Sequence, residues 1–453
     1  MDITSLRNKA IKPVTRQFYL PVVFIFSANI CYGFYEVEKN LQSSSGFENK
    51  ELSAEVILFA RPFLWLARSP STQTFDSETD HVGGGVFRLL GNGKVGNQFD
   101  WHFNLATAYV SDEFDLPFVF NNTNNSQPER SALFTKTVND EKQQDVFIDQ
   151  LYGRYTVKDS DILLGRQPIS LATTLYFTPN DFFAPFGAQT FFRDFKAGVD
   201  AIRLEHALGN LTQLSFFYVL GYQWDPFSGQ YKNNPDSDRA SKLVQVSSVI
   251  FNLEWKLLGG RVFDDPVIGG AIQGELFPGL GIRAEGHHRR PSNSQNSLFV
   301  YSKDPAHISE WVLGLEHQFT PDLAGRLEYF YNSAGASDEE DYPVLLTQLM
   351  SSGGSGSGLN LAAKYFAAGF DYQISPLWGM SSVVLSNAID NSYLFVFDFN
   401  YSLSNESVVN LGASIPTGDE PDTSLFFLNP LQSIQSEFGA YPDLISIELR
   451  IYF

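Results

Sequence analysis

Five pairs of oppositely charged residues are spaced two positions apart along the chain. In an extended strand, residues i and i+2 point to the same side of the sheet, so both charges of such a pair share one face. A face that carries both signs of charge can bind an ionic solute, or its charges can bind one another across neighbouring strands. The pairs are Arg203 with Glu205, Glu254 with Lys256, Arg283 with Glu285, Arg326 with Glu328, and Glu448 with Arg450.

Residue patterns that support catalysis or metal binding are missing from the sequence. The 7 His residues are scattered, and neither an H-E-x-x-H motif nor a G-x-S-x-G nucleophile elbow occurs. The chain has 1 Cys, which excludes a disulfide framework and a Cys-based metal or haem site. His102 shares a strand face with Asp100 and Asn104, and we interpret it as a lining residue. The sequence therefore predicts no enzyme, no cofactor and no metal.

A connection over residues 169–196 is rich in aromatic residues and also contains Pro179 and Pro185. Such a segment is too apolar to extend into water, because burial of its aromatic rings lowers the free energy of the folded protein. We expect it to fold back into the mouth or interior of the protein as a constriction. The alternatives are packing on neighbouring loops and contact with a lipid interface, where aromatic residues are favoured. The residues assigned to the constriction are Tyr176, Phe177, Phe182, Phe183, Phe186, Phe191 and Phe192.

The segments that carry the charged pairs alternate apolar and polar side chains with period two, as β-strands do. The alternation persists for about 10 residues per segment, whereas strands of soluble proteins average about 5 to 6 residues. Tilted strands of this length cross a bilayer, so the pattern favours a transmembrane barrel over a soluble sandwich. The last segment is an example, with one face made of Ile445, Ile447, Leu449, Ile451 and Phe453.

Short and long connections alternate along most of the chain, as they do in outer-membrane barrels with tight periplasmic turns and long extracellular loops. The runs predict about 18 strands, with about 16 as the alternative. One strand is predicted over 246–257, with a turn at Leu258-Gly259 and a short strand over 260–264. Another turn is predicted at Gly91-Asn92-Gly93. The predicted fold is all-β, a closed transmembrane antiparallel β-barrel.

The charged pairs should face the inside of this barrel, because a charge exposed to lipid at the midplane costs about 2 to 4 kcal/mol. One interpretation makes the basic members a ladder that guides an anionic solute. The other makes them interstrand salt bridges that keep a wet wall rigid. The sequence leaves both interpretations open.

The composition of the chain excludes further classes of protein. The chain has 453 residues, with 31 Lys and Arg against 51 Asp and Glu, and a formal net charge of −20. This acidic balance argues against a nucleic-acid binder, and no apolar run reaches the roughly 18 to 20 residues of a membrane-spanning helix. Residues 1–33 have the basic start, apolar stretch and small residues of a secretory signal peptide. Residues 34–50 are predicted to be a short periplasmic arm and residues 51–453 the barrel, in the outer membrane of a Gram-negative cell.

Two short motifs resemble a known family of barrels. Gly165-Arg166-Gln167 at the end of a strand, and the segment Val199 to Glu205 with sequence VDAIRLE, resemble the G-R-Q and F-D-x-x-R-L elements of outer-membrane barrels of the alginate-export type. The resemblance implies a porin-like channel with an Arg-lined constriction that passes an anionic polysaccharide. It also implies that Arg166 and Arg203 are lumen residues near that constriction. Val199 stands where the family has an aromatic residue.

The sequence thus predicts a passive outer-membrane channel for small hydrophilic or anionic solutes or a polysaccharide. A second hypothesis is a barrel that sheathes a periplasmic or haem partner, as in a porin-cytochrome electron conduit, and a third is a barrel enzyme. The predicted partners are outer-membrane lipid with lipopolysaccharide, and the barrel assembly machinery, which would recognise the C-terminal strand ending at Phe453. No nucleic-acid partner is expected.

Overall fold

The computed structural model describes residues 52–68, 79–111, 129–131, 134–139, 144–186, 194–225, 230–291, 307–351, 360–421 and 434–453. The predicted signal peptide (1–33) and periplasmic arm (34–50) lie outside the described residues. The account below concerns the described ranges.

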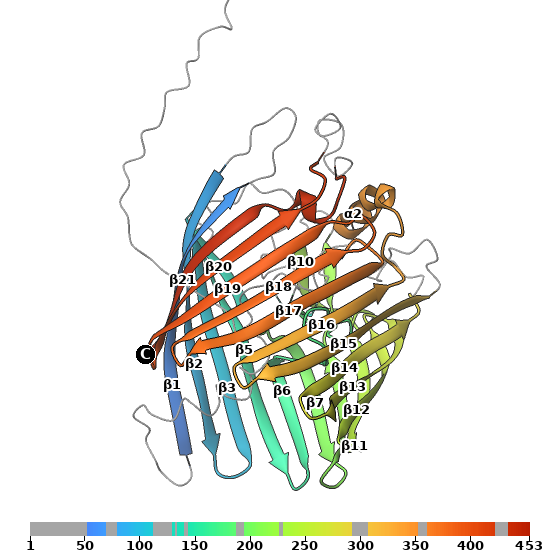
Figure 1. Cartoon of the computed structure of the whole chain (residues 1–453). Coiled ribbons are helices and arrows are strands. Elements are labelled where there is room, and N and C mark those ends of the chain that lie inside the picture. Colours follow the sequence, from blue (N-terminus) through green and yellow to red (C-terminus); the bar gives the residue numbers. More distant parts are fainter. Residues whose placement is uncertain are drawn as a thin grey trace, which may run out of the picture.

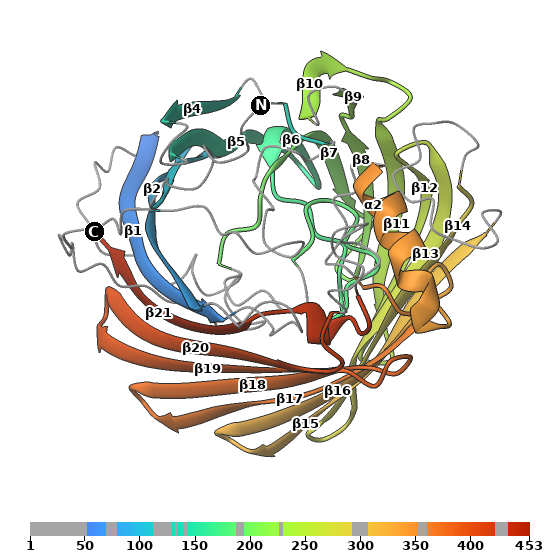
Figure 2. The same cartoon turned by 90° about the horizontal axis from the view of Figure 1, so that it is seen from above.

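Eighteen antiparallel strands of the described residues form a closed barrel, which confirms the predicted fold class (Figures 1 and 2). Consecutive barrel strands pair with each other, and the first strand also pairs with the last. At this seam the Phe453 N–H donates to the Leu58 carbonyl oxygen at 2.8 Å, and the Leu58 N–H donates to the Phe453 carbonyl oxygen at 3.2 Å. The strands are β1 (Leu52–Arg68), β2 (Thr79–Val95), β3 (Phe99–Val110), β5 (Gln144–Val157), β6 (Ser160–Gln167), β7 (Val199–Ala207), β8 (Thr212–Val219), β11 (Ser241–Ile250), β12 (Leu253–Val262), β13 (Asp265–Phe277), β14 (Leu280–Arg289), β15 (Ile308–Thr320), β16 (Leu323–Asn332), β17 (Lys364–Ser375), β18 (Trp378–Asn387), β19 (Tyr393–Ser404), β20 (Ser407–Thr417) and β21 (Asp443–Tyr452).

Shorter elements belong to the connections. β4 (Thr135–Asn139) pairs with β5, and β9 (Tyr222–Asp225) pairs with β10 (Gln230–Pro235) as a separate hairpin. The helical elements are η2 (Glu339–Asp341), α2 (Tyr342–Ser351) and η4 (Phe438–Ala440). Among the described residues, no helix has the length and apolar character needed to cross a membrane.

The strand alternation separates two environments. In β7, Ile202 and Leu204 are exposed on the outer surface of the barrel, whereas Arg203 and Glu205 lie half-buried on the inner side. In β15, Leu313 and Leu315 are exposed outside in the same way. Because successive side chains of a strand point to opposite faces, the apolar set meets lipid and the charged set meets the lumen.

The two ends of the barrel differ in their connections. At one end, the described strands are joined by turns of 2 to 4 residues, such as 158–159 and 405–406. At the other end lie most of the long connections, including 168–198, 333–363 and 418–442. By the usual orientation of bacterial barrels, the end with the long connections is the outer end.

Two of the predicted turns are wrong. The chain turns at Phe251 and Asn252, inside the predicted strand 246–257, and Leu258-Gly259 lies within β12. Phe251 and Asn252 both have positive φ, 54° and 61°, as the central residues of a tight hairpin turn of the primed type require. Phe rarely adopts this conformation, and Asn252 alone, without a Gly beside it, is a weak turn signal. The predicted turn at Gly91-Asn92-Gly93 is also wrong, because β2 continues to Val95.

Candidate functional site

The connection between β6 and β7, residues 168–198, folds into the interior of the barrel, and we call it the luminal loop. Its described parts are 168–186 and 194–198. Figure 2 shows its green trace inside the ring of strands. Its start packs with the inner side of the wall, where Ile169 and Leu171 join a buried cluster that includes Phe217 and Leu243.

Glu328 of β16 holds the middle of the luminal loop. Its Oε1 accepts the N–H of Leu175 at 2.7 Å, and its Oε2 accepts the N–H groups of Tyr176 at 3.0 Å and Phe177 at 3.1 Å. The Glu328 residue is only 4% exposed. Hydrogen bonds to a charged acceptor are roughly twice as strong as neutral ones, so this carboxylate fixes a stretch of backbone that no sheet pairs with.

Glu285 of β14 makes a second attachment of the same kind. Its Oε2 accepts the backbone N–H groups of Thr173 and, at 3.0 Å, Thr174, while Oε1 accepts the N–H of Asn180 at 3.1 Å. Glu285 is also 4% exposed. Two acids predicted from sequence to line the pore therefore face the interior but are occupied by the luminal loop.

The returning part of the luminal loop contacts the opposite side of the barrel. Asp194 forms a 2.6 Å ion pair with Arg450 of β21. The Phe195 ring lies 5.1 Å from the Phe59 ring of β1. The Arg88 guanidinium of β2 lies 4.6 Å from the centre of the Phe195 ring. Together with the Glu285 and Glu328 attachments, these contacts fix the loop to both sides of the interior.

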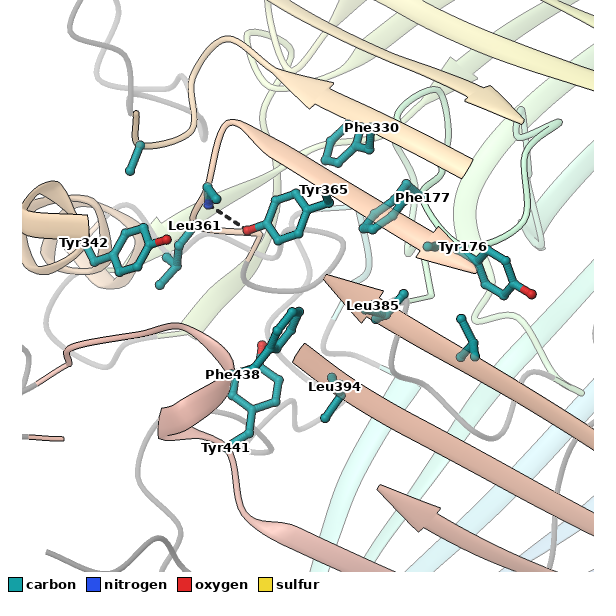
Figure 3. Packing of buried hydrophobic residues seen from close by; sticks show 14 of the residues in the cluster. Tyr176, Phe177, Phe330, Tyr342, Leu361, Tyr365, Leu385, Leu394, Phe438 and Tyr441 are labelled. Atoms are coloured by element: carbon teal, nitrogen blue, oxygen red, sulfur yellow. Dashed lines mark hydrogen bonds between the residues drawn. The ribbon is translucent and has the colours of Figure 1, made fainter. Parts of the chain in front are cut away.

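The predicted constriction residues are distributed along this path. Tyr176 and Phe177 pack in a cluster with Phe330 and Tyr365, as Figure 3 shows. The Phe177 ring lies 5.0 Å from that of Phe330. A Cβ atom at Gly369 of β17 would lie 2.1 Å from the Tyr176 hydroxyl, so the absence of a side chain there makes room for Tyr176.

Further out, the Phe182 ring lies 4.9 Å from that of His287, and the Phe183 ring lies 6.3 Å from that of Phe263. Lys196 lies 5.9 Å from the Phe186 ring and forms a 2.5 Å ion pair with Asp181, which links the two legs of the loop. Phe191 and Phe192 lie outside the described residues.

Below these attachments, a row of polar side chains crosses the inner wall from β12 to β17, and we call it the charge ladder. Gln273 donates to Glu254 and accepts from Arg283 Nη1 at 3.0 Å. Lys256, 3.6 Å from Glu254, also donates to the Thr173 hydroxyl at 3.3 Å. The ladder consists of Glu254, Gln273, Arg283, Glu316, Arg326 and Asp371.

The other half of the charge ladder alternates in sign. Arg283 Nε donates to Glu316 at 3.2 Å, and Arg326 Nε lies 3.8 Å from the same carboxylate. Arg326 is also ion-paired with Asp371. Of the two interpretations of the strand charges, interstrand pairing describes this side of the lumen. Glu316 and Asp371 were not predicted from sequence because their bases are on other strands, and strand register cannot be read from spacing alone.

On the opposite side, the wall of β21, β2 and β3 carries another group of charges. Glu448 and Arg450 lie on the inner side of β21, with Arg450 paired to Asp194 of the luminal loop. Arg88 donates to Asp149 at 2.6 Å and to Asn104 at 3.0 Å. These bases are therefore also neutralised by nearby acids.

The position of Arg166 differs from the lumen position that the family resemblance implied. It is 3% exposed, and its guanidinium donates to Asp200 at 2.7 and 2.9 Å and to the Ser131 carbonyl oxygen at 2.9 Å. In β6, Arg166 has the same parity as Ile162 and Leu164, which are exposed on the outer surface, and not the parity of the inward-facing Leu163. It joins an outer connection to β6 and β7 and offers no open charge to the lumen. Arg203, in contrast, lies inside, 3.5 Å from Glu205.

At the outer end, a buried polar network joins three connections. The Asn387 amide donates to Glu437 at 2.8 Å, to Asp390 at 3.0 Å and to the Tyr342 hydroxyl at 2.9 Å. The Tyr365 hydroxyl donates to Glu437, and Figure 3 shows Tyr342, Tyr365, Phe438 and Tyr441 around this point. Burial, and secondarily Asp390, raises the pKa of Glu437 to about 8.

This raised pKa predicts that the outer network weakens as pH rises. The pKa of Glu437 in the folded protein, about 8, exceeds the ordinary value of 4.5. The stabilisation that protonated Glu437 gives to the fold is therefore complete below pH 4.5 and is lost as pH rises through about 8. Hydrogen exchange at 434–441, corrected for intrinsic rates, should show protection that falls over this interval in the native chain. Protection should not depend on pH in Glu437→Gln, whereas Glu406→Gln, in an exposed turn, should retain the dependence. A pH-dependent Glu437→Gln protein would contradict this assignment.

Comparison with known proteins identifies the fold. No family model and no curated protein matches the sequence. The solved structure of Pseudomonas aeruginosa OccK11 (OpdR) matches with a TM-score of 0.52 and 8% identity, over 88% of this chain and 95% of that chain. Acinetobacter baumannii OccAB1 matches with a TM-score of 0.53 and 12% identity, over 88% and 96% of the two chains. P. aeruginosa OccK9 (OpdG) matches with a TM-score of 0.53 and 11% identity, over 88% and 98%. The protein therefore has an outer-membrane, porin-like β-barrel fold that resembles the fold of these Occ proteins.

Proposed function

We propose that the protein is a passive channel in the outer membrane of a Gram-negative cell, which passes small hydrophilic solutes, including anions. The observation that supports this most is the charge ladder, a hydrogen-bonded polar row on the inner side of a closed wall whose outer side is apolar. Polar groups on the inside and apolar groups on the outside are what a water-filled lumen in a bilayer requires. The luminal loop narrows this path.

The constriction is proposed to lie where the luminal loop approaches the charge ladder. Thr173 is the point of contact, since its carbonyl oxygen accepts from Arg283 at 3.1 Å and its hydroxyl accepts from Lys256 at 3.3 Å. A solute passing here meets bases and acids at close range. Such a wall recognises solutes by the placement of charge within them more than by net charge.

Two other functions predicted from the sequence can be compared with the passive channel. An anionic polysaccharide, implied by the alginate-export resemblance, is the larger solute to test. A sheath around a haem partner is less compatible with a loop fixed to β14, β16 and β21, because the loop occupies interior space that a partner needs. Recognition of the C-terminal strand by the assembly machinery stays a prediction.

Reversal potentials in planar bilayers under a salt gradient test the channel and its charge preference. We expect discrete open steps from the purified chain. Glu316→Gln should shift the reversal potential towards anion preference and Arg283→Gln towards cation preference, because each removes one charge from the same ladder. The absence of steps would exclude a channel. Shifts of the same sign in both variants would exclude the ladder as the path.

A further inference from the structure

Two histidines meet at the outer end of the barrel, on the side of the wall away from the lumen. His288 lies near the end of β14, and His307 immediately precedes β15. His288 Nε2 lies 3.2 Å from His307 Nδ1, and the rings are stacked with centroids 5.2 Å apart. Both side chains are exposed, whereas the neighbouring His287 and Arg289 are buried. The pair is therefore accessible from solution.

A third side chain orients this pair. His288 Nδ1 lies 2.8 Å from the Ser309 hydroxyl, whose oxygen can accept a hydrogen bond from the Nδ1–H. When Nδ1 carries the proton, the lone pair of His288 is on Nε2 and points towards His307. Metal-bound histidines are commonly held in this way, with the second ring nitrogen donating to a neighbouring group.

The separation of the two nitrogens matches a shared ion. Two imidazole nitrogens at 2.0–2.1 Å from a tetrahedral Zn²⁺ are about 3.3 Å apart. The observed 3.2 Å therefore needs little movement of either ring. We propose that His288 and His307 bind a divalent transition-metal ion, Zn²⁺ or Cu²⁺, whose ions favour imidazole nitrogen.

Water would complete the coordination of this ion. The described ranges contain no group of three or more His, Cys, Asp or Glu side chains that could hold a metal ion. The histidine pair therefore supplies two protein ligands. The ion would join the end of β14 to the residue that precedes β15. Its role is then to hold these two strand ends together at the outer end of the barrel, independently of solute passage through the lumen.

The site is placed at the level of the membrane interface. Trp311 lies on the same face of β15 as Ser309, is exposed, and lies 5.6 Å from the Tyr331 ring. Trp and Tyr concentrate at membrane interfaces, so the histidines one step further out lie beyond the hydrocarbon. Trp311 also provides a reporter, because Cu²⁺ quenches nearby indole fluorescence.

Titration of the purified full chain in detergent with Cu²⁺ and, separately, Zn²⁺ tests the site. We expect saturable quenching by Cu²⁺ that is missing in Trp311→Phe, and an electron paramagnetic resonance spectrum with two nitrogen ligands. His288→Gln and His307→Gln should each lower the Cu²⁺ affinity about tenfold or more, because one of two protein ligands is lost. His317→Gln, at the opposite end of β15, should bind like the native chain.

Three outcomes would overturn the proposal: unchanged Cu²⁺ affinity in both variants, a spectrum without two nitrogens, or loss of binding in His317→Gln. A further arm measures inorganic phosphate at acidic pH without metal. Phosphate binding that the same two variants abolish, together with no metal binding, would instead identify a cationic patch for lipid phosphates. Folding of each variant is checked by comparing the gel mobility of heated and unheated protein, because a folded barrel migrates differently from the unfolded chain. Loss of metal binding can then be distinguished from loss of folding.

Discussion

Deleting residues 172–194 should raise the single-channel conductance about twofold or more, because conductance follows the cross-section of the narrowest part of a pore. The deletion removes the segment that Glu285 and Glu328 hold and that Asp194 ties to Arg450. Single-channel recording in planar bilayers measures the effect. Unchanged conductance would show that the luminal loop does not narrow the path.

Replacing both holding carboxylates tests the same idea without removing any chain. Glu285→Gln with Glu328→Gln leaves the shape of the side chains, but each carboxylate becomes a neutral amide with one acceptor oxygen, and its NH2 group would face a backbone N–H. Hydrogen bonds to charged groups contribute about 1.5 to 3 kcal/mol each, against about 0.5 to 1.5 for neutral ones. We expect the double variant to flicker between a native-like level and a larger one. Glu254→Gln, which has no described contact with the loop, should conduct without added flicker.

Gly369→Ala should destabilise the barrel by about 1 to 3 kcal/mol, the usual cost of an extra group in a packed interior. The added Cβ would lie 2.1 Å from the Tyr176 hydroxyl and 2.7 Å from the Ser382 carbonyl oxygen. Urea unfolding in detergent, followed by the loss of heat-modified gel mobility, measures the change.

A second substitution assigns the cause of that loss. Gly369→Ala should cost less in a Tyr176→Ala background than in the native chain, since the clash with the Tyr176 ring is then missing while the Ser382 oxygen remains. Full native stability of Gly369→Ala alone would contradict the close packing of Tyr176 on β17. An equal cost of Gly369→Ala in both backgrounds would place the whole cost on Ser382.

The barrel itself could be predicted from sequence because lipid and water impose a simple rule on every strand. Ile202 and Leu204 alternate with Arg203 and Glu205, and this pattern alone indicates which side faces oil. The alternation of short and long connections along most of the chain was also predicted correctly. The turn at Phe251 and Asn252 was not, because a Phe with positive φ is set by tertiary structure and not by its own preference.

The candidate site was only partly predictable. The inward direction of Glu285 and Glu328 followed from strand period, but their acceptance of loop N–H groups more than a hundred residues away did not. Cross-strand partners such as Glu316 depend on register, which one sequence does not reveal. Arg166 was assigned to the lumen by motif resemblance, whereas the structure pairs it with Asp200 under an outer connection.

The most direct test uses one thiol on each side of the same strand. Glu316→Cys and Leu315→Cys are neighbours in β15, with Glu316 in the charge ladder and Leu315 exposed on the outer surface. Each is made with Cys31→Ser, which removes the 1 Cys of the chain. A charged thiol reagent added during single-channel recording should lower the conductance of the Glu316→Cys channel in one step and leave the Leu315→Cys channel unchanged. Block of Leu315→Cys, or no effect on Glu316→Cys, would contradict the account of a water-filled lumen enclosed by this wall.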